Sequence, residues 1–106
     1  EIDLNSDLTY QLFFNDYSNL GDLTQLNSDD LPDFDVMLAG FPCQTFSIVG
    51  KRAGLDDNRG QIIYYLTDIL KQKKVSFFIL ENVKGLINHN KGETLNFILS
   101  LLLEAG

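Results

Sequence analysis

The hydrophobic and polar positions of the 106-residue chain alternate between short apolar runs and amphipathic stretches. Two nearly continuous apolar runs, 34–39 and 76–80, are typical of buried strands in a parallel sheet. Apolar residues recur at helical spacing in 61–73 and 94–103, which predicts two amphipathic helices. A shorter helix is predicted at 8–14, with Asp7 as its N-cap. Strands that alternate with helices predict an α/β fold with a mainly parallel sheet.

Two stretches between these elements lack a clear period. Residues 21–24 are predicted as the end of a short strand, and 40–60 form a Gly-rich connection whose length is typical of functional loops. In parallel sheets ligands bind beyond the carboxyl ends of the strands, so polar residues at those ends become site candidates. They are Asp22, then Pro42, Cys43 and Gln44, and then Glu81 and Asn82.

The composition is typical of a protein from a reducing compartment. It has one cysteine, so it has no internal disulfide. It shows no leader pattern and no apolar run near the roughly 20 residues that cross a membrane. We therefore expect a cytoplasmic protein without a membrane partner.

Charge is unevenly distributed along the chain. The net charge is −7, which argues against a free-standing nucleic-acid-binding domain. Residues 1–50 contain nine acids and no Lys or Arg, whereas 51–106 hold all eight bases and six acids. The first bases, Lys51, Arg52 and Arg59, lie in the Gly-rich connection, where they could meet a polyanion. On charge alone, a solvated loop is the commoner interpretation.

Cys43 and Glu81 are candidates for chemistry because each follows a predicted strand. An ionised thiol is a good nucleophile, although a lone cysteine is more often a small buried apolar residue. A carboxyl group in a partly apolar pocket can act as an acid near neutral pH, although a strand-end carboxylate is more often solvated. Asn82 could orient Glu81, or it could be an ordinary turn residue.

Three further residues have weaker signals. Glu1 and Asp22 could each hold ribose hydroxyls, as acids at strand ends often do, or could be surface carboxylates. His89 is the only histidine. A Cys–His hydrolase pair with Cys43 is conceivable, but the neighbouring asparagines favour a solvated side chain.

The combination of motifs is more specific than any single residue. Gly40-Phe41-Pro42-Cys43-Gln44 is followed by Phe46-Ser47, by Asp57-Asn58-Arg59-Gly60 and, after the next strand, by Glu81-Asn82-Val83. This order and spacing closely resemble the DNA cytosine carbon-5 methyltransferase family, and its bacterial restriction–modification enzymes most of all. Glu1-Ile2-Asp3, Gly21-Asp22-Leu23-Thr24 and Gly92-Glu93-Thr94-Leu95 extend the resemblance over essentially the whole chain.

The resemblance implies a fold and a reaction. The fold would be part of a doubly wound, Rossmann-like methyltransferase domain that uses S-adenosylmethionine. Cys43 would attack carbon-6 of a cytosine flipped out of duplex DNA, and Glu81 would contact ring nitrogen 3. Carbon-5 would then receive the methyl group. Flipping is required because carbon-6 cannot be reached inside the base stack.

The resemblance also assigns the remaining site residues. Pro42 would shape the turn near the target base, and Gln44 and Ser47 would belong to a mobile loop that closes on DNA. Asn82 would hold the Pro-Cys turn, with Val83 beside it. Lys51, Arg52 and Arg59 would meet phosphates. Glu1, Ile2, Asp22 and Leu23 would line the cofactor pocket, and no metal is implied.

The family's Gly-rich cofactor motif, its Gln-x-Arg-x-Arg motif and its target-recognition domain are missing from this sequence. We therefore expect residues 1–106 to be a partial catalytic domain that is inactive alone, from a parent enzyme that could have a cognate restriction endonuclease. Three alternatives stay open: a non-catalytic methyltransferase-like binding or regulatory protein, an RNA cytosine methyltransferase, and a Cys43–His89 thiol hydrolase.

Overall fold

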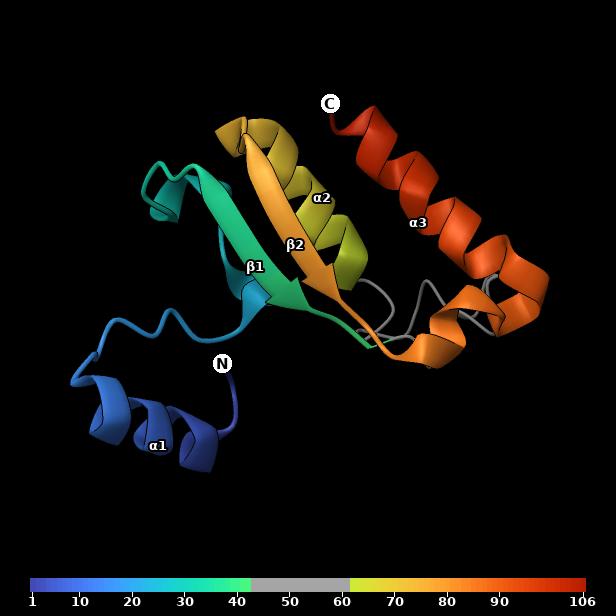
Figure 1. The fold of residues 1–106 in the computed structure, drawn as a ribbon. Helices are drawn as coiled ribbons and strands as arrows, with labels where there is room; N and C mark the ends of the chain where they lie inside the picture. Colours follow the sequence, from blue (N-terminus) through green and yellow to red (C-terminus); the bar gives the residue numbers. More distant parts are fainter. Residues whose placement is uncertain (43–61) are drawn as a thin grey trace.

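A computed structural model describes residues 1–42 and 62–106, which form a small α/β unit (Figure 1). Strands β1 (Val36–Gly40) and β2 (Phe77–Glu81) pair in parallel, from Val36 opposite Phe77 to Gly40 opposite Glu81. Helix α2 (Ile62–Lys73) lies in the connection between them. The predicted strands 34–39 and 76–80 are confirmed, starting two and one residues later than expected. The parallel sheet and its helices confirm the α/β class of this part of the chain.

The core lies between one face of the sheet and helices α2 and α3 (Glu93–Glu104). Met37 faces this core from β1, while Ile63 and Leu66 come from α2 and Ile98 comes from α3. The apolar stripe of α2 predicts this burial, because residues three and four apart share one helix face. No helix in the described ranges is both long and apolar enough to span a bilayer.

The other face of the sheet is open among the described residues. Leu38 is 72% exposed, Phe77 70% and Ile79 66%. The expectation that both strands are buried was therefore wrong for this face. Alternate side chains of a strand point to opposite faces, so a continuous apolar run covers two faces. Only one of them has a partner in the described structure.

Helix α1 (Leu4–Phe14) lies apart from the sheet and from the other helices (Figure 1). It begins at Leu4 rather than at residue 8, and its N-cap is Asp3, not Asp7 as predicted. The Oδ1 of Asp3 accepts a hydrogen bond from the Ser6 amide at 2.7 Å, which satisfies one of the free N–H groups of the first turn. None of its residues is buried, so its apolar side chains contribute nothing to the core described here.

Short side-chain turns, and not a strand, organise the chain before β1. The predicted strand end at 21–24 is wrong: the 3-10 helix η1 (Leu23–Gln25) forms there, and η2 (Ser28–Asp30) follows. Asp22 is the N-cap of η1, and its Oδ1 accepts from both the amide and the hydroxyl of Thr24 at 2.8 Å. Asx side chains compete with strand pairing in this way, because they bond to the backbone two residues on.

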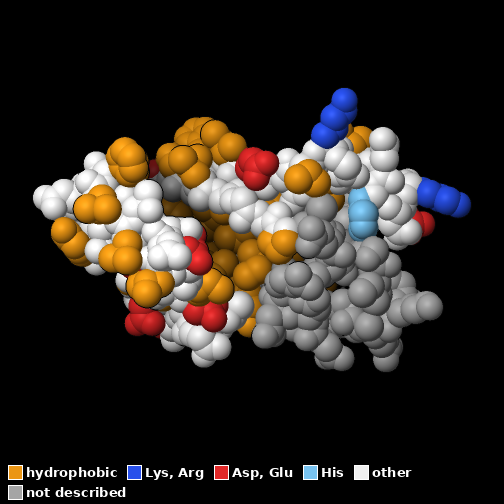
Figure 2. All heavy atoms as spheres, turned by 90° about the horizontal axis from the view of Figure 1, so that it is seen from below, with side chains coloured by type: hydrophobic (Ala, Val, Ile, Leu, Met, Phe, Trp, Pro, Cys, Tyr) orange, Lys and Arg blue, Asp and Glu red, His pale blue; other side chains and the backbone are white. Residues whose placement is uncertain are grey.

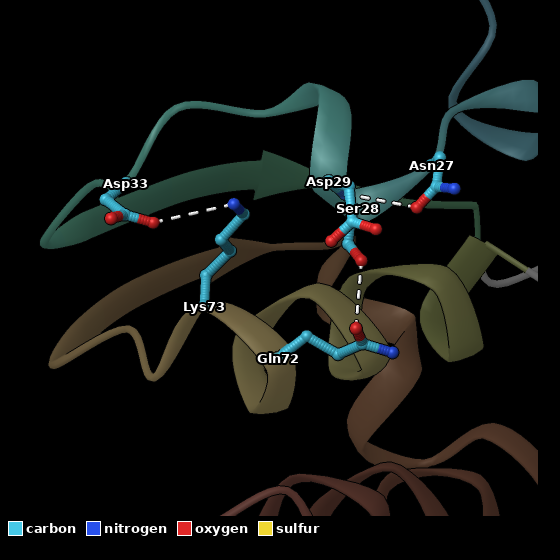
Figure 3. A network of polar contacts seen from close by, with 6 residues as sticks. All are labelled: Asn27, Ser28, Asp29, Asp33, Gln72 and Lys73. Carbon is cyan, nitrogen blue, oxygen red and sulfur yellow. Dashed lines mark hydrogen bonds and ion pairs between the residues drawn. The ribbon is translucent and has the colours of Figure 1, made fainter.

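Two contacts hold the segment before β1 against α2 (Figure 3). The Ser28 hydroxyl donates to Oε1 of Gln72 at 3.0 Å. Nζ of Lys73 donates to Oδ1 of Asp33 at 3.5 Å. The ion pair is worth at most about 1 kcal/mol, because the Asp33 side chain is almost fully exposed. Both contacts nevertheless fix where this segment crosses the helix.

The chain after β2 turns through two 3-10 helices, η5 (Lys84–Ile87) and η6 (His89–Gly92), before α3 begins. The predicted helix at 94–103 is confirmed and is extended by one residue at each end. Of its expected apolar stripe, Ile98 is buried and Leu95 and Leu102 are half-buried, whereas Leu99 is exposed.

Candidate active site at the strand ends

The carboxyl ends of β1 and β2 are joined by one side chain, that of Asn82. Its Nδ2 donates to the carbonyl oxygen of Phe41 at 2.6 Å, and its Oδ1 accepts from the Val83 amide at 2.8 Å. Phe41 is buried in the core, which gives this bond a fixed anchor. Asn82 therefore ties the chain that leaves β1 to the chain that leaves β2.

The carboxylate of Glu81 lies beside the backbone of Gly40. The two residues face each other in the parallel register. A Cβ atom on Gly40 would lie 3.2 Å from Oε2 of Glu81, which is tighter than an ordinary van der Waals contact. A side chain at this position would require the carboxylate to shift by a few tenths of an ångström. Glu81 itself is exposed, so its carboxylate can reach a ligand at this edge of the sheet.

Pro42 is half-buried and is the last described residue before the gap. Six predicted site residues lie outside the described ranges: Cys43, Gln44, Ser47, Lys51, Arg52 and Arg59. Their roles stay predictions, as does the arrangement of the Gly-rich connection. Because Pro42 directly precedes Cys43 in the chain, the Asn82–Phe41 bond lies two residues from the predicted nucleophile.

A second group of predicted residues gathers around Glu1. Its backbone nitrogen lies 3.2 Å both from Oδ1 of Asn19 and from the carbonyl oxygen of Gly21. Nδ2 of Asn19 returns a bond to the Glu1 carbonyl at 3.0 Å. Asn19 thus holds the first residue of the chain next to the segment that carries Asp22, although the two acids are 21 positions apart.

Hydrogen bonds from Thr24, first from its hydroxyl and then from its amide, lower the pKa of the Asp22 carboxyl below its ordinary value. Asp22 is therefore a stable hydrogen-bond acceptor at neutral pH. Ile2 is 77% exposed and available to a ligand, whereas Leu23 is half-buried and packs against the core.

The end of the molecule where the strands finish is hollowed, with an apolar floor and carboxylates on its rim (Figure 2). A separate pocket of about 280 Å³ opens beside Glu1 and is lined by Tyr10, Asp16 and Asn19 among others. Apolar surface with a few placed acceptors is the usual composition of a small-molecule site.

Comparison with known proteins places this arrangement in a family. The model of the C-5 cytosine-specific DNA methylases matches residues 1–106. The chain is a member of that family. The resemblance inferred from the motifs is thereby confirmed.

Curated relatives of the C-5 cytosine methylase chain include phage and bacterial proteins. Orphan methyltransferase M.SPRI of Bacillus phage SPR is 46% identical over 88 residues, which cover 83% of this chain and 20% of the relative. Type II methyltransferase M1.ScrFI of Lactococcus lactis subsp. cremoris is 44% identical over 104 residues, covering 98% and 26%. Type II methyltransferase M.HgiCI of Herpetosiphon aurantiacus is 46% identical over 104 residues, covering 98% and 24%. The chain thus spans about a fifth to a quarter of these relatives.

His89 of this methylase chain is less exposed than predicted. It is half-buried, and its Nδ1 lies 2.7 Å from Oγ1 of Thr94, which is itself only 3% exposed. The predicted polar loop is in fact compact. Among the described residues, no three His, Cys, Asp or Glu side chains are grouped so as to hold a metal ion.

Three contributors to the site were not predicted from the sequence: Gly40, Phe41 and Asn19. Gly40 and Phe41 could have been found from the sequence, because aligning the carboxyl ends of the two predicted parallel strands places Gly40 opposite Glu81. For Asn19 the sequence carries no signal, since an asparagine in a polar connection is common and its bonds to Glu1 depend on tertiary folding.

Proposed function

We propose that the protein containing these residues transfers a methyl group from S-adenosylmethionine to carbon-5 of a cytosine flipped out of duplex DNA. One observation carries the proposal. Glu81 lies beside Gly40, and Asn82 is hydrogen-bonded to Phe41. The segment that precedes Cys43 and the segment that follows Glu81 are therefore held next to each other. A reaction that needs a nucleophile and a carboxyl group on the same base would use this geometry. Membership of the C-5 cytosine methylase family supports the same reaction.

The chain's own groups would act on the cytosine ring as follows. The Cys43 thiolate attacks carbon-6 and forms an S–C bond, while Glu81 donates a hydrogen bond or proton at ring nitrogen 3. The electron pair released at carbon-5 makes that atom nucleophilic. After methylation, carbon-5 loses its proton to a base, the S–C bond breaks and the thiolate is regenerated. Cytosine is a poor electrophile, so both the nucleophile and the charge relief at nitrogen 3 are needed.

The residues near the N-terminus fit the proposed methyl donor. The carboxylates of Glu1 and Asp22 are exposed acceptors of the kind that bind ribose hydroxyls, and the exposed Ile2 offers an apolar contact for adenine. Asn19 holds the two acidic segments together. When bound, S-adenosylmethionine supplies the methyl group. Leu23 would support this pocket from the core and not line it, because it is packed against the core.

The DNA side of the site would include Pro42, the loop residues Gln44 and Ser47, and the bases Lys51, Arg52 and Arg59. Val83, which is 59% exposed beside Asn82, would add apolar surface next to the target base. In this proposal the chain is part of a doubly wound catalytic domain that acts in the bacterial cytoplasm. A restriction endonuclease for the same DNA site would be its partner in a restriction–modification system.

The experiment traps the covalent step. The full-length protein is incubated with S-adenosylmethionine and duplexes that contain 5-fluorocytosine, because fluorine at carbon-5 blocks the final loss of the proton. A denaturation-resistant protein–DNA adduct is expected, and it should vanish in Cys43→Ser. Absence of the adduct from a folded protein that binds S-adenosylmethionine would contradict the proposal. It would favour a non-catalytic relative, or an RNA substrate if RNA were methylated instead.

A further inference from the structure

The described lysines form two groups at opposite ends of the strands. Lys71, Lys73 and Lys74 lie at the end of α2, just before β2 begins. Lys84 and Lys91 lie in η5 and η6, directly after β2 ends at Glu81. Figure 2 looks onto this second end, and cationic side chains project at its edge. Because η5 and η6 follow the carboxyl end of β2, Lys84 and Lys91 lie on the same side of the sheet as the candidate site.

The segment that carries Lys84 and Lys91 is locally basic in an acidic chain. Residues 82–92 contain these two lysines and no Asp or Glu, whereas the whole chain has a net charge of −7. Both lysines are exposed, and neither makes an ion pair within the described residues. The next carboxylate, Glu93, accepts a hydrogen bond from Nδ2 of Asn90 at 3.0 Å. The two ammonium groups are thus left for an external anion.

The position of Lys91 is fixed by an unusual backbone. Asn90, Lys91 and Gly92 all have left-handed φ values, of 50°, 57° and 86°. For lysine this conformation costs about 1–2 kcal/mol, so the surrounding structure must hold it. The contact between His89 and the buried Thr94 anchors the segment from inside. Lys91 is consequently presented from a defined turn and not from a loose loop.

We propose that Lys84 and Lys91 each contact a backbone phosphate of the duplex beside the target cytosine, an inference that rests on the proposed function. A polyanion approaching an acidic protein needs local positive charge at the docking face. Contacts to phosphates fix the position of the duplex and carry no sequence information. These two lysines would therefore set how the DNA lies across the strand ends, whatever site the enzyme recognises.

The test is the salt dependence of duplex binding by the full-length protein, measured with a fluorescent duplex between about 50 and 200 mM salt. Lys84→Gln and Lys91→Gln should each reduce the slope of log K against log salt by about 0.9. Lys84→Arg and Lys91→Arg keep the charge and should keep the slope. Lys71→Gln removes an exposed lysine at the opposite end of the strands and should change nothing. At saturating DNA, kcat should be unchanged in all variants.

The outcomes separate this inference from the proposed function. If the wild type binds and methylates DNA but both Gln variants keep its slope, the phosphate contacts are refuted and the methyltransferase stands. If the slope falls as expected while no base is methylated, the contacts stand and the reaction is refuted. If the wild type does not bind duplex DNA at all, both are refuted.

Discussion

The side chain of Asn82 donates a hydrogen bond of 2.6 Å to the backbone carbonyl of Phe41, 41 positions earlier in the chain. The bond crosses between the ends of two parallel strands and fixes one segment relative to the other. Because the acceptor is a backbone carbonyl, a substitution of Asn82 removes the bond and leaves Phe41 unchanged. It therefore offers a direct test of how precisely the strand ends must be held.

Asn82→Asp should impair catalysis more than folding. The substitution replaces the amide donor by a carboxylate oxygen that faces the Phe41 carbonyl, so attraction becomes repulsion. We expect kcat in the full-length enzyme to fall by about 10- to 100-fold, the size of effect that a misplacement of about 1 Å can have. Asn88→Ala is the matched control, because Asn88 is an exposed asparagine nearby whose side chain is not involved in the strand-end contact. Equal kcat values for the two variants would show that the bond has no role in catalysis.

Gly40→Ala should displace the Glu81 carboxylate. The added Cβ would lie 3.2 Å from Oε2, so that oxygen must move by a few tenths of an ångström. We expect a folded enzyme with a lower kcat, and Glu81→Asp should add little further loss in the Gly40→Ala background because the two residues are coupled. Gly85→Ala is the control, since a Cβ there meets nothing within 4 Å. Additive losses in the double variant would contradict the coupling.

Thr94→Val should destabilise the chain. The substitution keeps the shape of this nearly fully buried side chain and removes the hydroxyl that lies 2.7 Å from Nδ1 of His89. A half-buried ring nitrogen without its partner costs about 1–3 kcal/mol. Chemical unfolding of the full-length protein measures the loss. Ser100→Ala, which removes an exposed hydroxyl from the same helix, should cost much less; a similar cost for both would mean that the His89 contact is not stabilising.

Asp22 should titrate below its ordinary pKa. The hydroxyl and the amide of Thr24 donate hydrogen bonds to the ionised carboxylate of Asp22 and so lower its pKa. Because the pKa of Asp22 is lower in the folded state, its ionised carboxylate stabilises the fold at pH values above the pKa of the unfolded chain. This contribution is lost as the pH falls through the folded value. Carbon-13 NMR of labelled aspartate should show the shift. Thr24→Ala should move the pKa upward, and an unchanged pKa would refute the bonding.

Much of the fold follows from the sequence because its elements are locally determined. The apolar runs of β1 and β2 and the helical spacing of α2 and α3 depend on side-chain periodicity alone. The predictions were wrong where an aspartate side chain could form more than one local hydrogen bond to the backbone. Asp3, and not Asp7, is the N-cap of α1, and Asp22 forms an Asx turn where a strand was expected. Periodicity cannot rank such alternatives, because local hydrogen bonds from a side chain to the backbone leave the apolar pattern unchanged.

The site was only partly predictable for a related reason. The motifs place Glu81 and Asn82 at a strand end, but they do not say which backbone group Asn82 bonds to or that Gly40 makes room for Glu81. Those facts depend on strand register, which is a tertiary property. His89 shows the opposite error, since a polar neighbourhood in sequence concealed a half-buried contact with Thr94.

Residues 1–106 expressed alone should associate and should not methylate DNA. One face of the β1–β2 sheet is apolar and exposed, and such a surface binds to other apolar surfaces. We expect the isolated piece to bind the dye ANS and to sediment as oligomers. Leu38→Thr with Ile79→Thr should reduce both signals, because threonine suits a strand but is polar. Leu103→Thr removes a similarly exposed leucine from α3 and should have little effect. A monomeric piece that does not bind the dye, or one that methylates duplex DNA unaided, would contradict this prediction.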